Sequence, residues 1–215
     1  MRIQSHEASI TEIVKKLFQA SHGSHDWEHT RRVVGLTKTI GAIEGADMDV
    51  AVAGALLHDI GRCPRDSAEH AACHAAKGAG MAYNILKSLN FTSEQRENII
   101  HCIAAHRYRK QPDPETLEAK VVFDADKLDA IGAIGIARAY LFAGELGARL
   151  HNPEIDVEQS PAYSENDTGY REYRVKLRWI KEKMLTDCGR KMARDRHEFM
   201  ELFFHRFLTE YEGKI

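Results

Sequence analysis

The sequence predicts an all-α protein. Apolar residues recur at intervals of three and four over most of the chain, which is the spacing of one face of a helix. The alternation of apolar and polar residues that is typical of half-buried strands is absent from the sequence. Residues that begin or end helices separate the apolar segments, for example Asp26 before one segment and Gly61 after another. We therefore expect a bundle of helices.

Three helices are expected in the first 61 residues. The first covers residues 10–18, where apolar side chains share one face. The second covers residues 29–40 and carries His29 in its first turn. The third covers residues 47–61, begins at an aspartate that can cap it, and is apolar almost throughout. That composition is typical of a helix in the protein core.

The rest of the chain is expected to be helical except for one loop. Two helices cover residues 67–89 and 93–107, with a serine or threonine as the cap of the second. A long helical stretch over residues 115–150 contains four glycines, which we expect to mark close helix contacts or a bend. Two amphipathic helices over residues 170–184 and 187–212 follow.

The loop covers residues 151–169, which contain two prolines, many polar residues and no apolar period. A loop of this length often has a function, so we expect a mobile flap near the active site. A chain of 215 residues with 43% hydrophobic residues can bury the core of one domain. We expect a single domain over residues 1–215, with a core of about residues 20–150 and C-terminal helices over residues 170–213.

Charge and hydropathy exclude several classes of protein. The formal net charge is −2, so there is no basic field to hold a long nucleic acid by counterion release. The longest apolar run, residues 50–57, is much shorter than the roughly 20 residues that cross a membrane. The N-terminus lacks the pattern of a secretory signal, and the four cysteines show no paired spacing. We expect a cytoplasmic protein without a membrane partner.

Two pairs of ionisable residues interrupt apolar helical segments. His58 and Asp59 follow an apolar run, and burying them without a partner would be so costly that they require a cation or each other. Asp126 and Asp129 are spaced to share one helix face, where their charges repel unless a positive group lies nearby. With His29 upstream, the sequence offers two imidazoles together with carboxylates, which are ligands for a divalent metal.

These residues lie in longer strings that resemble one protein family. The strings are SHDWEHTRRV, LLHDIG, DADKLDAIGAIGIAR and ARDRHEFMELFFHRF. In this order they resemble the HD-domain superfamily of metal-dependent phosphohydrolases, whose signature of histidines and aspartates is carried on a helical bundle. The strings are most similar to a subgroup of small bacterial HD proteins. That similarity implies hydrolysis of nucleoside triphosphates between the α and β phosphates.

The resemblance implies a metal site formed by His29, His58, Asp59 and Asp126. Asp124 and Asp129 compete for the last position, and the family pattern favours Asp126, which leaves Asp129 either to orient a ligand or to act as the base that orients a water molecule. The other candidate catalytic residues are Arg62, Lys77, His74, His106 and Lys127, with Arg107, Arg138 and Lys176 as further cations for phosphate groups. We expect one ion of Mn²⁺, Co²⁺, Ni²⁺ or Mg²⁺ rather than two, since the adjacent histidine pair of dinuclear members is missing.

Ordinary roles remain open for the same residues. His29 can be a polar histidine in a first helical turn, and His58 and Asp59 can be a hydrogen-bonded pair at a helix end. The cations can form a solvated face. The expected substrate is a small phosphorylated molecule, a nucleotide above all, and a homodimer is compatible with the sequence. A 5′-nucleotidase, an alarmone hydrolase and a nucleotide-sensing module without turnover remain as alternatives.

Overall fold

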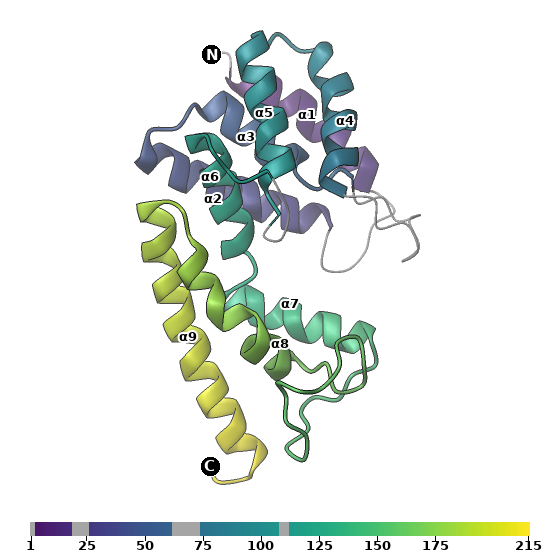
Figure 1. Ribbon diagram of the computed structural model, residues 1–215, viewed down its shortest axis with the longest axis vertical. Coiled ribbons are helices and arrows are strands. Elements are labelled where there is room, and N and C mark those ends of the chain that lie inside the picture. Colours follow the sequence, from purple (N-terminus) through teal and green to yellow (C-terminus); the bar gives the residue numbers. More distant parts are fainter. Residues whose placement is uncertain (1–2, 19–25, 62–73, 108–111) are drawn as a thin grey trace. The chain divides into compact units, whose positions relative to one another are not determined.

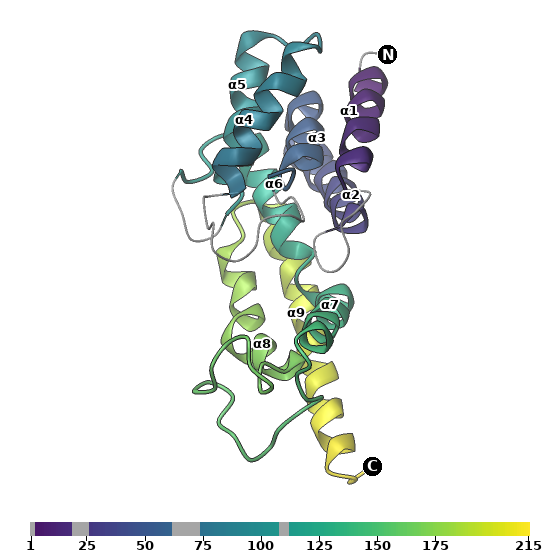
Figure 2. The same cartoon turned by 90° about the vertical axis from the view of Figure 1, so that its right-hand side faces the viewer.

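The computed structural model describes residues 3–18, 26–61, 74–107 and 112–215, and all regular structure in these ranges is helical (Figures 1 and 2). In chain order the elements are α1 (Ile3–Phe18), α2 (Trp27–Glu44), α3 (Met48–Leu57), α4 (His74–Lys87), α5 (Ser93–Ala105), α6 (Leu117–Leu128), α7 (Gly132–Glu145), α8 (Gly169–Val175), the 3-10 helix η1 (Leu177–Lys183) and α9 (Asp187–Tyr211). The all-α prediction is confirmed.

The chain forms two compact units, an N-terminal unit of Met1–Asp126 and a C-terminal unit of Lys127–Ile215. The boundary between them falls inside α6. The expectation of a single domain stays a prediction. Among the helices of the described ranges, none has the length and apolar character that crossing a membrane requires.

Helix α3 is the central element of the N-terminal unit. Its first turn is capped by Asp47, whose Oδ1 accepts a hydrogen bond from the Asp49 amide at 2.9 Å. All eight residues from position 50 to position 57 are buried, because α3 packs against α1, α2 and α5. A Cβ atom at Gly54 would lie 2.9 Å from Cys102 Cβ on α5, so the close approach of these two helices requires glycine. The C-terminal end of α3 is therefore in the interior of the unit.

Hydrogen bonds fix the starts of the two helices that approach this end. The Oδ1 of Asp26 accepts a hydrogen bond from the His29 amide at 3.0 Å and so caps α2. At the start of α6, the Glu118 carboxylate accepts hydrogen bonds from the Asp47 amide at 2.8 Å and from Asn98 Nδ2 at 2.9 Å. The starts of α3 and α6 are therefore tied to each other and to the middle of α5.

The helical stretch that we expected over residues 115–150 is interrupted. Helix α6 ends at Leu128, and α7 begins at Gly132 after a short turn. Gly132 has a φ of +76°, which is costly for any residue with a Cβ atom. A Cβ atom there would also lie 3.0 Å from Cγ of Arg196. The expected bend is therefore a complete break between two helices.

The C-terminal unit is built from α7, α8, η1 and α9. The helix expected over residues 170–184 is divided into α8 and η1, because Lys176 between them has a non-helical backbone with φ −140° and ψ −58°. Thr186 caps α9 by accepting a hydrogen bond from the Gly189 amide at 3.0 Å. Helix α7 packs against α8 and α9, and η1 runs back along the first half of α9 (Figures 1 and 2).

Residues 151–169, which we expected as a mobile flap, are held to α8 by the buried side chain of Arg171. Arg171 Nε donates to Ser160 Oγ at 2.8 Å, and its Nη2 donates to the Ser160 carbonyl at 2.7 Å. Its Nη1 donates to Asp167 Oδ1 at 2.7 Å, and Asp167 Oδ2 accepts a hydrogen bond from the Tyr163 amide. Because these contacts are made by polar groups, the spacing of apolar residues in the sequence does not reveal them. Closure of the loop over a substrate stays a prediction.

Candidate metal centre

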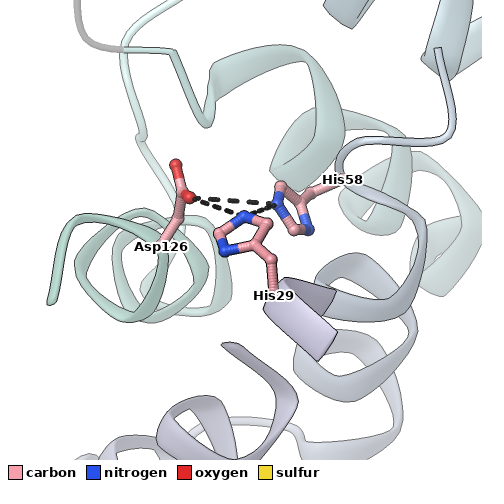
Figure 3. Close-up of side chains that lie close together, drawn as sticks. All are labelled: His29, His58 and Asp126. Carbon is pink, nitrogen blue, oxygen red and sulfur yellow. Dashed lines mark hydrogen bonds and ion pairs between the residues drawn. The ribbon is translucent and has the colours of Figure 1, made fainter. Parts of the chain in front are cut away.

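Three predicted ligands converge in the N-terminal unit, from the first turn of α2, the end of α3 and the last turn of α6 (Figure 3). The His29 Nε2 atom lies 3.3 Å from His58 Nε2 and 3.4 Å from Asp126 Oδ1. The distance from His58 Nε2 to Asp126 Oδ1 is 3.9 Å. The two histidines are 1% exposed, and Asp126 is 14% exposed. These ligand atoms therefore face one another in a nearly buried position.

Asp59 adds a second carboxylate to this group. Its Oδ2 lies 3.8 Å from His29 Nε2 and 3.7 Å from His58 Nε2. Ligands bound at about 2.1 Å to one ion lie about 3.0 to 3.4 Å from their neighbours in octahedral or tetrahedral geometry. The distances within this cluster are close to that range. The residues present therefore fit a divalent metal ion.

The hydrogen bond of His58 sets its tautomer for metal binding. Its Nδ1 lies 2.8 Å from the Ala55 carbonyl oxygen, which can only accept, so Nδ1 carries the proton and Nε2 presents a lone pair to the cluster. Burial lowers the pKa of His58 to about 4, although the charges of Asp59 and Asp126 act in the opposite direction. His58 is therefore neutral near neutral pH, which is the form that binds a metal.

His106, one of the candidate catalytic residues, also lies against the cluster. It follows the last residue of α5, and its Nδ1 donates to the Ile103 carbonyl oxygen at 2.6 Å. Its Nε2 lies 3.4 Å from Asp59 Oδ1, on the carboxylate oxygen that is not directed at the other two histidines. By contrast, His101 accepts a hydrogen bond from the Glu115 amide at 3.0 Å.

The remaining predicted residues divide into three groups. Arg62 and the side chain of His74 lie outside the described residues. Lys77 is exposed on α4, and Arg107 is half-buried after α5. The cations and the carboxylate that belong to the C-terminal unit are Lys127, Asp129, Arg138 and Lys176. Their roles at the site stay predictions.

Arg138 and Lys176 form ion pairs inside the C-terminal unit. Arg138 Nη1 lies 2.9 Å from Asp129 Oδ2, and Asp129 is only 1% exposed. Lys176 forms an ion pair with Glu172 one helical turn away. Asp129 is thus engaged by a cation of its own unit, and its role at the site stays a prediction.

Arg196 is a residue to which the sequence analysis gave no role. Its Nη1 donates a hydrogen bond at 2.5 Å to the carbonyl oxygen of Leu128, which is 68 positions away in the chain. The string that contains Arg196 was part of the family resemblance, but the spacing of charges within α9 does not reveal a contact over such a separation. The contact matters because Leu128 ends the helix that carries Asp126.

Comparison with known proteins identifies the class. A sequence profile described as the HD domain matches residues 26–131, the range that contains the cluster. A solved HD-superfamily hydrolase from Bacillus thuringiensis superposes with a TM-score of 0.78 at 27% identity, covering 98% of each chain. The chain belongs to the HD-domain superfamily of metal-dependent phosphohydrolases.

Similarity to one relative extends over nearly the whole chain. The uncharacterized protein YpgQ of Bacillus subtilis is 31% identical over 204 residues, which are 93% of this chain and 91% of YpgQ. The crystal structure of YpgQ in complex with ADP superposes with a TM-score of 0.75 at 32% identity, covering 98% of this chain and 96% of that chain. The predicted superfamily, fold class and enzymatic nature are thereby confirmed.

Replacement of His58 tests the cluster as a metal site. His58→Ala removes an imidazole whose orientation is set by the Ala55 carbonyl, so we expect the purified variant to lose most of its bound metal while its helical circular dichroism persists. Elemental analysis after dialysis measures the metal content. His101→Ala is the matched control and should keep its metal, because His101 bonds to the Glu115 amide instead. Wild-type metal content in His58→Ala would contradict the assignment.

The buried, neutral His58 should also make the metal-free protein sensitive to acid. His58 has a pKa of about 4 in the folded chain and an ordinary value of 6.5 when unfolded. Between these values the unfolded state binds more protons, so stability falls as the pH is lowered through this window, by roughly 3 kcal/mol for this one group. Urea unfolding in the presence of a chelator measures the loss. His58→Gln should lose less stability over the same range, and an equal loss would count against this explanation.

Proposed function

We propose that the protein hydrolyses nucleoside or deoxynucleoside triphosphates to the monophosphate and pyrophosphate, with one divalent ion held by His29, His58, Asp59 and Asp126. The observation that carries the proposal is the convergence of these four side chains within an HD domain. In a phosphohydrolase, such a cluster is the place where a water molecule and a phosphate group meet.

The protein groups supply a rigid, nearly dry ligand set. Mn²⁺, Co²⁺, Ni²⁺ and Mg²⁺ suit mixed imidazole and carboxylate ligands and keep positions for water and a phosphate oxygen. When bound, such an ion acidifies a water molecule and withdraws charge from the phosphoryl group. The Ala55 carbonyl holds His58 in the required tautomer, and His106 lies against the second oxygen of Asp59. Both contacts restrict how the ligands can turn.

A nucleotide substrate is supported by the relatives. The YpgQ protein, similar over nearly the whole chain, has been crystallised in complex with ADP. The strings around His58 and Asp126 resemble the subgroup that cleaves between the α and β phosphates. Water would add to the α phosphorus, and the bond from that phosphorus to the α–β bridging oxygen would break, which releases pyrophosphate. Arg62, Lys77, His74, Arg107 and Lys127 are the candidate groups that bind the polyphosphate.

A nucleotide panel with separate detection of orthophosphate and pyrophosphate tests this function. With Mn²⁺, Co²⁺ or Mg²⁺ present, we expect nucleoside triphosphates to give equal amounts of monophosphate and pyrophosphate, and His58→Ala to give neither. Orthophosphate released from nucleoside monophosphates would instead support a 5′-nucleotidase. Pyrophosphate released from a guanosine tetraphosphate-like alarmone alone would support an alarmone hydrolase. Nucleotide binding without any product would support a sensing module.

A further inference from the structure

Two arginines of the C-terminal unit hold the end of the helix that carries Asp126. Arg196, on α9, donates through Nη1 to the Leu128 carbonyl oxygen at 2.5 Å. Arg138, on α7, donates through Nη1 to the Asp129 carbonyl oxygen at 3.1 Å and to Asp129 Oδ2 at 2.9 Å. We call this group the arginine clamp. It consists of the two arginines and of the carboxylate that pairs with Arg138, namely Asp129, Arg138 and Arg196.

The end of an α-helix is the place where such contacts have the largest effect. The last carbonyl groups of a helix have no amide partner within it, and they form the negative end of its dipole. Helix ends therefore fray unless other groups satisfy these carbonyls. Asp126 lies only two positions before the last residue of α6, so it is part of the turn that would fray. Cations that bind this end favour the ordered conformation of that turn.

The clamp is largely removed from solvent, so its ion pair is weakly screened. Asp129 is 1% exposed and Arg138 is 17% exposed. The aliphatic part of Arg196 passes directly over Gly132, where an added Cβ atom would lie 3.0 Å from its Cγ. Burial lowers the pKa of Arg196, and the charges of Asp129 and Asp195 oppose this shift. The guanidinium stays charged because the ordinary pKa of arginine is far above neutral pH. The two arginines come from α7 and α9, which pack against each other inside the C-terminal unit.

We propose that the arginine clamp positions Asp126 for metal binding. This inference rests on the metal site of the proposed function. Asp126 lies two positions before Leu128 and three before Asp129, so a change of this helix end that releases Leu128 and Asp129 from the arginines also moves the Asp126 carboxylate. That movement separates Asp126 Oδ1 from His29 Nε2 and His58 Nε2, now 3.4 Å and 3.9 Å away. Arg138 and Arg196 are thus positioning residues, which act through Asp126.

Calorimetric titration of the metal-free, full-length protein with Mn²⁺ tests the clamp. The variants are Arg138→Met, Arg196→Met and the double substitution, with Arg138→Lys as the conservative replacement. Loss of groups that orient a metal ligand typically weakens metal binding about 10- to 100-fold, and we expect the Kd of the double variant to rise within this range. Each single variant should show a smaller rise, and Arg138→Lys should recover part of it. Saturating Mn²⁺ should restore hydrolysis.

Arg171→Met is the matched control for a merely structural effect. Arg171 is an arginine of the same unit, 8% exposed, and its ion pair with Asp167 and its bonds to Ser160 do not involve α6. We expect this variant to melt at a lower temperature but to bind Mn²⁺ within about twofold of the wild type. The reason is that the bonding partners of Arg171 differ from those of the clamp, and substitutions at such separate sites act independently. An equal loss of affinity in Arg171→Met would overturn the proposal, because it would reflect general destabilisation.

Hydrogen exchange gives a second measurement in case the double variant does not fold. Amides of residues 125–131 should exchange faster in each folded single variant than in the wild type, and those of α3 should not. Clamp variants that bind Mn²⁺ as tightly as the wild type overturn the inference and leave the proposed function intact. A wild-type protein that binds Mn²⁺ without hydrolysing any nucleotide refutes the proposed function. In that case the Mn²⁺ affinities of the clamp variants still test whether the clamp positions Asp126.

Discussion

The burial of His58 and Asp59 at the end of α3 is the constraint on which the rest of the site depends. These residues are 1% and 4% exposed, directly after a helix whose last eight residues are all buried. An imidazole and a carboxylate in such a place require partners, since an isolated buried charge is very costly. The Ala55 carbonyl, His29, His106 and Asp126 meet this requirement. The cluster is therefore both a condition for the fold of the N-terminal unit and a place where a divalent cation is favoured.

Hydrogen bonds hold the helices that deliver these partners around α3. Asp26 caps α2 three positions before His29, and Glu118 ties the first turn of α6 to α3 and α5. The other end of α6 is bound by the arginine clamp within the C-terminal unit. Helix α6 is thus held at both ends, and Asp126 lies in the last turn. Residues remote in sequence from the signature therefore contribute to the orientation of one ligand.

Much of the fold and the site could be predicted from short stretches of sequence. The helical spacing of apolar residues, and polar residues that interrupt an apolar run, are both visible within such stretches. The spacing of apolar residues indicated the helices, and the apolar context of His58 and Asp126 indicated the cluster. The break after Leu128 was expected only as a bend, since a glycine in a helical pattern does not reveal its φ. The anchor of the loop by Arg171 and the contact of Arg196 with Leu128 could not be predicted, because they join distant positions through hydrogen bonds that leave no periodic signal.

The most direct test of the account is the location of a bound ion in the protein. Crystals of the full chain grown with Mn²⁺ can be measured at wavelengths where manganese scatters anomalously. The account predicts a single anomalous peak at about 2.0 to 2.3 Å from His29 Nε2, His58 Nε2, Asp59 Oδ2 and Asp126 Oδ1. A peak that excludes His58 or Asp126, or a strong peak elsewhere with none at this cluster, would contradict it.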